Sequence, residues 1–173
     1  MGYDGGKSGI SAYMNEVIAG LSEDHCIHLL ILESEIENFP LQESKNLKFI
    51  IYSDFYAKPL INMLWHLFFL PFTLNFKDYD FIYLPAGNRR LFCRNKIPTL
   101  VTFHDLSQFH IEAKYDKFRM AYIKKIIPYF LKKVDRIIAI SESTKKDIVH
   151  FYKIDESKIS TNHNGFDGKL YKS

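Results

Sequence analysis

The chain has 173 residues, of which 47% are apolar, 16% aromatic and 25% charged, and its formal net charge is +3. This length predicts one domain with a substantial core, and the apolar content excludes a disordered protein. The charge is too small to predict nucleic-acid binding by itself, and no zinc-finger or ribonucleoprotein motif is present. Two cysteines and the lack of a visible signal peptide favour a reduced, cytoplasmic setting.

The first predicted element is a helix. Apolar residues recur at helical spacing over residues 10–21, and Ser8 or Ser11 can cap the start. This helix follows directly on a glycine-rich segment.

Short apolar runs predict strands at 26–32, 47–52, 80–84, 98–103, 134–140 and 158–162. The first two runs are nearly continuous, which predicts burial on both faces. The acidic stretch 33–43 between them predicts a loop.

Three further helices are predicted. Residues 59–76 are the most apolar stretch, but they are short for a membrane span and contain polar residues, so a buried or membrane-surface helix is expected. Residues 115–133 form a basic amphipathic pattern that Pro128 should kink or restart. A helix ending near residue 152 is capped by Ser141 or Ser143, or begins with a capping box from Thr144 to Asp147.

Strands therefore alternate with helices, which predicts an α/β protein with a doubly wound, mainly parallel sheet. Ligands of such sheets bind beyond the carboxyl ends of the strands. Three polar sites are expected there: the loop from Gly5 to Gly9, the pair His104-Asp105, and the run Ser141-Glu142-Ser143.

The glycine-rich loop also suggests a nucleotide-binding P-loop, because Gly6-Lys7-Ser8 has its final residues. The earlier glycine of that pattern falls on Met1, and too few residues precede Gly5 for the usual strand. The P-loop pattern is thus incomplete, and a P-loop phosphotransferase is kept as an alternative function only. A non-catalytic saccharide-binding or partner-binding module is a second alternative.

Several segments in order resemble the N-terminal half of a family 4 glycosyltransferase with the two-domain GT-B architecture. They are the Gly5-Gly6-x-x-Gly9-Ile10-Ser11 start, the strand 98–106 that ends in His-Asp-Leu, the unit 128–143, and the turn Asn164-Gly165-Phe166-Asp167. The resemblance covers almost the whole chain and implies one Rossmann-like, acceptor-side domain over residues 1–173.

The resemblance implies retaining transfer of a sugar from a nucleotide-sugar donor to a saccharide or lipid-linked acceptor, in bacterial surface polysaccharide or glycolipid synthesis. No metal and no cofactor is implied, because the nucleotide-sugar is a substrate. It also implies a cytoplasmic protein with peripheral contact to the inner face of the membrane, through the segments 59–76 and 115–133, and no nucleic-acid partner.

The implied site residues form three groups. The backbone near Gly5, Gly6, Gly9 and Ile10 faces the donor diphosphate, with a plain turn before a helix as the alternative. His104 contacts the transferred sugar, or is a core histidine bonded to a carbonyl, and Asp105 orients it or caps the next segment. The cleft is lined by Ser141, Glu142, Ser143, Asn164 and Gly165.

The sequence departs from the family pattern at both ends. The family's first strand, before the glycine loop, is absent, and so is the second domain that supplies most nucleotide contacts. The isolated chain is therefore expected to transfer sugar poorly or not at all.

Overall fold

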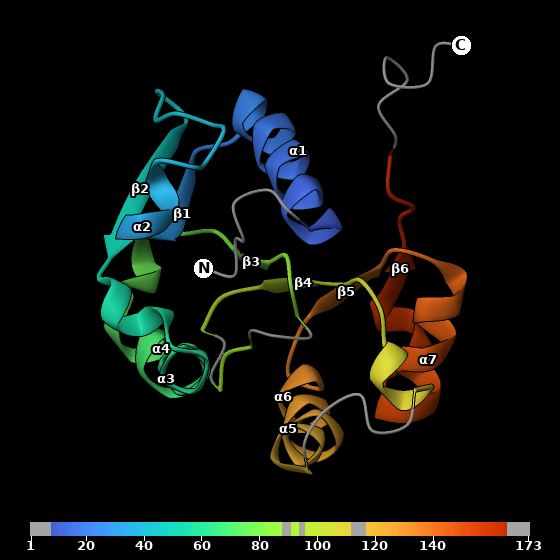
Figure 1. Cartoon of the computed structure of the whole chain (residues 1–173). Helices are drawn as coiled ribbons and strands as arrows, with labels where there is room; N and C mark the ends of the chain where they lie inside the picture. Colours follow the sequence, from blue (N-terminus) through green and yellow to red (C-terminus); the bar gives the residue numbers. More distant parts are fainter. Residues whose placement is uncertain (1–7, 88–90, 94–95, 112–116, 166–173) are drawn as a thin grey trace. The chain divides into compact units, whose positions relative to one another are not determined.

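The computed structural model describes residues 8–87, 91–93, 96–111 and 117–165 (Figure 1). The chain divides into two compact units, an N-terminal unit of residues 1–75 and a C-terminal unit of residues 76–173. Each unit has its own parallel sheet.

The N-terminal unit begins with helix α1 (Gly9–Asp24). Ser8 rather than Ser11 is its cap, because the Ser8 side chain accepts a hydrogen bond from the Ser11 backbone at 3.3 Å. The helix contacts a two-stranded sheet of β1 (Ile27–Leu32) and β2 (Leu47–Tyr52). One cluster of buried core residues in this unit consists of Met14, Ile18, Ile31, Phe39 and Leu47.

The predicted burial of these two strands on both faces is wrong. His28 in β1 is exposed, and so are Lys48 and Ile51 in β2. Each strand has one strand partner among the described residues, so both are edge strands of this sheet. The predicted loop between them contains a single helical turn, α2 (Glu33–Ile36).

A helical segment closes the N-terminal unit. After the 3-10 turn η1 (Asp54–Ala57), it runs without interruption through α3 (Pro59–Leu64), the π-helical η2 (Trp65–Phe69) and α4 (Leu70–Thr73). The Trp65 ring contacts the rings of Tyr52 and Tyr56, with centroid distances of 4.7 and 4.8 Å. One side of the segment is therefore buried, and the prediction that this stretch is helical is confirmed for residues 59–73.

The C-terminal unit contains a four-stranded sheet in the order β3-β4-β5-β6. Its strands are β3 (Ile82–Leu84), β4 (Thr99–Phe103), β5 (Arg136–Ala139) and β6 (Ile159–Thr161). Its helices are α5 (Lys117–Ala121), the π-helical η5 (Tyr122–Ile126), α6 (Ile127–Leu131) and α7 (Glu142–Tyr152). Short 3-10 turns occur at η3 (Phe76–Asp78), η4 (Ser107–Phe109) and η6 (Glu156–Lys158).

The core of the C-terminal unit lies between the central strands and their helices. Val101, Phe103, Ile137, Ala139 and Ile148 are fully buried. Helix α7 contacts β5 and β6, and the Phe103 ring at the end of β4 packs edge-on against Tyr152 of α7.

The predicted α/β class is confirmed, since every pairing between described strands is parallel and helices flank the sheets. The predicted restart of the basic helix at Pro128 is wrong, because helical backbone runs without a break from Lys117 to Leu131, through the π-helical η5 directly before α6. The strands form two sheets rather than the one expected. In the described parts of the chain, no helix has the length and apolar character needed to span a membrane.

Candidate functional site

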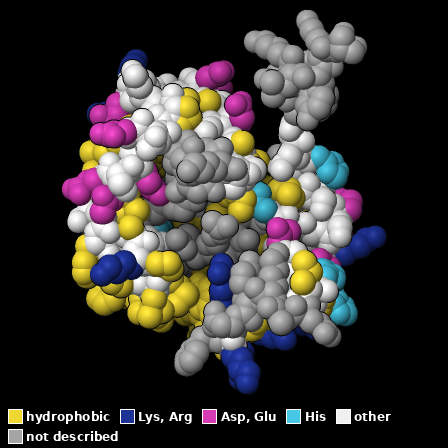
Figure 2. All heavy atoms as spheres, in the orientation of Figure 1, with side chains coloured by type: hydrophobic (Ala, Val, Ile, Leu, Met, Phe, Trp, Pro, Cys, Tyr) yellow, Lys and Arg dark blue, Asp and Glu magenta, His cyan; other side chains and the backbone are white. Residues whose placement is uncertain are grey.

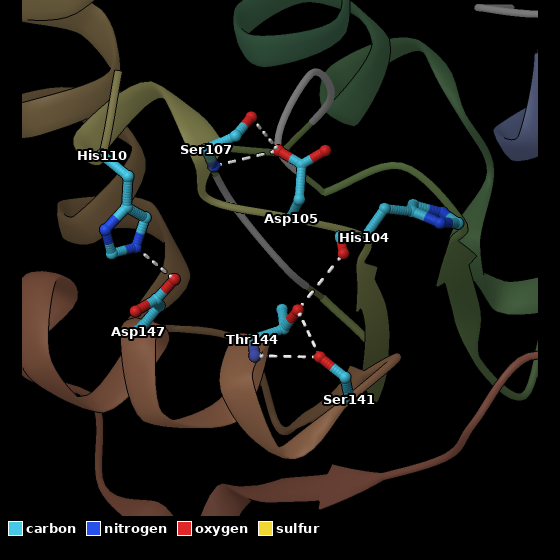
Figure 3. Close-up of polar contacts among 7 residues, drawn as sticks. All are labelled: His104, Asp105, Ser107, His110, Ser141, Thr144 and Asp147. Carbon is cyan, nitrogen blue, oxygen red and sulfur yellow. Dashed lines mark hydrogen bonds and ion pairs between the residues drawn. The ribbon is translucent and has the colours of Figure 1, made fainter. Parts of the chain in front are cut away.

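The predicted polar sites after β4 and β5 lie together in the C-terminal unit. The two strands are adjacent and parallel, with Phe103 opposite Ala139, so their carboxyl ends share one edge of the sheet. His104 follows β4 directly, and Ser141 follows β5 and caps α7 (Figure 3). The sequence prediction that these segments converge therefore agrees with the geometry.

Thr144 connects the two strand ends. Its hydroxyl donates to the backbone carbonyl of His104 at 3.2 Å and lies 3.0 Å from the Ser141 hydroxyl. The Ser141 oxygen also accepts from the Thr144 backbone N–H at 3.1 Å, which is an ordinary N-terminal helix cap. The proposed capping box from Thr144 to Asp147 is wrong, because Ser141 is the cap.

The His104 ring is buried and points away from Thr144 (Figure 3). Its Nε2 lies 2.8 Å from the backbone carbonyl of Pro85, just after β3. A carbonyl oxygen only accepts hydrogen bonds, so Nε2 carries a proton and donates it to this contact. The ring thus has a fixed orientation at the ends of β3 and β4.

Asp105 has a local role in the turn after β4. Its Oδ1 accepts from the Ser107 hydroxyl at 2.7 Å and from the Ser107 backbone N–H at 3.1 Å. This is the geometry of an aspartate that closes a short turn. Of the two roles considered for Asp105, capping of the next segment is the one that these contacts support.

Helix α7 also holds the far end of this turn. Asp147 and His110 form an ion-pair contact of 2.8 Å between Oδ2 and Nε2. The Phe109 and Phe151 rings stack with their centroids 4.3 Å apart. Thr144, Asp147 and Phe151 are spaced by three and four residues, so one side of α7 holds the segment 104–110 at both ends.

Tyr152 supports the site from the core. It is 1% exposed and packs edge-on against Phe103 and Phe109. Burial raises the pKa of Tyr152 above the ordinary tyrosine value, because the charged phenolate would lose its hydration. The hydroxyl therefore stays neutral across the physiological range.

The remaining predicted site residues are distributed over both units. Gly9 and Ile10 form the first turn of α1 in the N-terminal unit, while Gly5 and Gly6 lie outside the described residues. In the C-terminal unit, Glu142 and Ser143 are exposed in the first turn of α7. The exposed residues Asn164 and Gly165 follow β6.

Sequence reasoning named Thr144 and Asp147 only as a capping box, and it missed their contacts with the segment 104–110 as well as Pro85 and Phe151. Thr144 stands three residues after the cap Ser141, a spacing that could have marked it as a helix-start residue facing the strand ends. Nothing local marks Pro85, Asp147 or Phe151, since their partners lie 19 to 42 residues away in the chain. Within the described part of the chain, no cluster of His, Cys, Asp and Glu has a metal-binding arrangement.

Comparison with known proteins shows the family of the chain. No curated protein matches the chain significantly. The family model described as Glycosyltransferase Family 4 matches residues 7–169, which cover most of both units. The chain therefore belongs to glycosyltransferase family 4.

Proposed function

We propose that this chain is the acceptor-side domain of a retaining glycosyltransferase in bacterial surface polysaccharide or glycolipid synthesis. It transfers a sugar from a nucleotide-sugar donor to a saccharide or lipid-linked acceptor in the cytoplasm. A second domain supplies most contacts to the nucleotide, and the reaction uses no further cofactor or metal. The observation that carries the proposal is the position of His104 beside Ser141 at the carboxyl ends of adjacent parallel strands, where such sheets bind ligands.

His104 is the residue we propose to contact the transferred sugar. Its Nε2–H is directed at the Pro85 carbonyl, which fixes the orientation of the ring at the strand ends. Imidazole nitrogens can hydrogen-bond sugar hydroxyls, and this chemistry supports the proposal. Asp105 keeps the following turn closed through Ser107 rather than acting on the ring.

The donor diphosphate is proposed to bind at the start of α1. The first backbone N–H groups of a helix have no partner within the helix and lie at its positive end. Gly9 and Ile10 occupy this turn, and Gly9 leaves the approach open because a Cβ there would meet no atom within 4 Å. Gly5 and Gly6 complete the proposed phosphate loop.

The test begins with the gene, which should be read past the codon for Ser173 to obtain the full product. That product is incubated with a panel of radiolabelled nucleotide-sugars and a lipid extract of the source cells. We expect transfer that His104→Ala abolishes and His25→Ala leaves intact. His25 is an exposed histidine in the N-terminal unit and serves as a matched control.

Three results discriminate the alternatives. Transfer that survives in His104→Ala would remove this histidine from the proposal. Product with inverted anomeric configuration, measured by NMR, would contradict a retaining enzyme. ATP hydrolysis that disappears in Lys7→Ala, without sugar transfer, would favour the phosphotransferase instead.

A further inference from the structure

The stretch after β6 contains the turn motif Asn164-Gly165. Residues 162–165 belong to no helix or strand, and all four are exposed. The last backbone hydrogen bond to the sheet, among the described residues, runs from the Asn162 N–H to the Ala139 carbonyl at 2.9 Å. Figure 1 shows this stretch running away from the end of β6, and Figure 2 shows it at the surface of the molecule. Asn164 and Gly165 therefore lie beyond the strand pairing that orders the C-terminal unit.

Asn164 differs from other asparagines of the chain in two respects. The Asn46 side chain donates to two backbone carbonyls at 3.0 and 3.3 Å, and the buried Asn62 side chain donates to one at 2.8 Å. Within the part of the chain that the structure describes, no hydrogen bond of this kind holds the Asn164 side chain. Asn164 is also the single asparagine that glycine follows in the sequence. Its amide is thus exposed, unrestrained and next to an unhindered backbone nitrogen.

An asparagine in this setting can react with the backbone of the next residue. Once a base removes the proton of the Gly165 N–H, the nitrogen attacks Cγ of Asn164 and forms a new C–N bond. The bond from Cγ to Nδ2 breaks, ammonia leaves, and a cyclic imide remains. Water then opens the imide at either carbonyl and leaves aspartate or isoaspartate. The overall reaction consumes water and releases ammonia, without an oxidant or reductant.

The local geometry permits this attack. The backbone at Asn164 must rotate to bring the Gly165 nitrogen to Cγ, and backbone outside helices and strands moves at little free-energy cost. Gly165 has no Cβ to shield its nitrogen, and a Cβ built there would meet no atom within 4 Å. Water and base therefore have access to the reacting atoms in the folded protein.

We propose that Asn164 is a site of spontaneous deamidation, with the Gly165 backbone nitrogen as the nucleophile and with no protection from the fold. The reaction adds a carboxylate after β6. Because β5 and β6 are parallel, with Ala139 opposite Thr161, this charge lies beyond the sheet edge that also carries Ser141. An effect on sugar transfer rests on the proposed function, whereas the deamidation itself does not.

The test follows the mass of each asparagine as the folded chain ages. The full chain is kept in mildly alkaline buffer, which favours loss of the Gly165 amide proton, and is then digested with trypsin. Cleavage after Lys158 and Lys169 releases residues 159–169, which contain both Asn162 and Asn164. Tandem mass spectrometry should show that Asn164 exchanges an NH group for an oxygen atom, while Asn162 keeps its mass over the same time. Asn162 is an internal control, because histidine follows it and its backbone N–H is bonded to the sheet.

A comparison with a synthetic peptide of residues 159–169 measures protection by the fold. We expect the rate at Asn164 in the folded chain to equal the rate in the peptide within about threefold, because no ordered structure has to open first. Gly165→Ala should slow the reaction by about fivefold or more, since a Cβ restricts the backbone beside the nucleophile. Circular dichroism should show an unchanged fold in this variant, because the added Cβ meets open space. Asn164→Gln should not react on this timescale, because its longer side chain has to close a larger ring.

Four outcomes would overturn the proposal. They are an unchanged mass at Asn164 while the peptide reacts, a rate in the folded chain that is more than about threefold below that of the peptide, equal reaction at Asn162 and Asn164, and an undiminished rate in Gly165→Ala. The measurement involves no sugar donor, so its failure leaves the proposed transfer reaction untouched. Failure of the transfer assay likewise leaves the deamidation site untouched.

Discussion

Thr144→Val tests whether the hydroxyl between the two strand ends holds the site together. Thr144 is 5% exposed, and its hydroxyl donates to the His104 carbonyl at 3.2 Å. Valine keeps the branched shape but removes this buried hydrogen bond and the contact with Ser141. A lost buried hydrogen bond costs about 1 kcal/mol, and the desolvated carbonyl adds about 1 kcal/mol, so the free energy of unfolding should fall by about 2 kcal/mol.

The chain contains a matched control for this substitution. The Thr161 hydroxyl oxygen in β6 is enclosed, but it has no hydrogen-bond partner among the described atoms. Thr161→Val therefore removes a desolvated polar atom that contributes no bond, and valine suits a strand. We expect its free energy of unfolding to stay equal or to rise by up to about 1 kcal/mol.

Urea unfolding followed by circular dichroism measures both variants. A double-mutant cycle of Thr144→Val with Ser141→Ala should also give a coupling energy of about 0.5–1 kcal/mol. The reason is that the two hydroxyls contact each other and that the Ser141 oxygen accepts from the Thr144 backbone N–H at the start of α7. Equal stabilities of Thr144→Val and Thr161→Val would refute the reasoning. A coupling energy of zero would show that the helix cap and the strand-end contact are independent.

Two further predictions concern packing and pH. A Cβ on Gly87 would overlap Val101 and lie 2.7 Å from Phe103, so Gly87→Ala should lower the free energy of unfolding by about 3 kcal/mol. Gly20 in α1 has open space around it, so Gly20→Ala should raise the free energy of unfolding by about 0.5–1 kcal/mol. The same urea assay measures both variants. Burial raises the pKa of Tyr152 in the folded protein above the unfolded tyrosine pKa of about 10. The contribution of neutral Tyr152 to stability is therefore complete below pH about 10 and declines as the pH rises toward the pKa of the folded state. In Tyr152→Phe, the free energy of unfolding should therefore fall less steeply with pH above about 10 than in the wild type. Equal slopes of the two proteins in this pH range would contradict the prediction.

The sequence predicted well those features of the fold that depend on neighbouring residues. The helix caps are an example, since Ser8 and Ser141 each stand directly before an apolar helical repeat and each accepts a backbone N–H. These features depend on a few neighbouring residues, which a sequence displays directly. Pro128 shows the limit of such signals, because the helix continues through it with a π-helical turn directly before it instead of restarting.

The predictions that failed depend on distant residues. The apolar run of β2 suggested burial on both faces, yet Ile51 is 53% exposed, because strand composition does not tell how many neighbours a strand has in its sheet. The His110–Asp147 contact joins residues 37 apart, and neither residue has a local pattern that points to the other. The general position of the site followed from topology, since the ends of parallel strands must share an edge, but the side chains that hold it did not.

The contacts of α7 restrict how the proposed site can work. The segment 104–110 is fixed at its start by Thr144 and at its end by Asp147 and Phe151, and the His104 ring is tied to Pro85. A histidine held in this way keeps one tautomer and one orientation, so it can position a sugar hydroxyl but has little freedom to follow a moving substrate. If the proposed transfer requires a closure, elements other than this turn must supply it, because the turn is held by contacts at both of its ends.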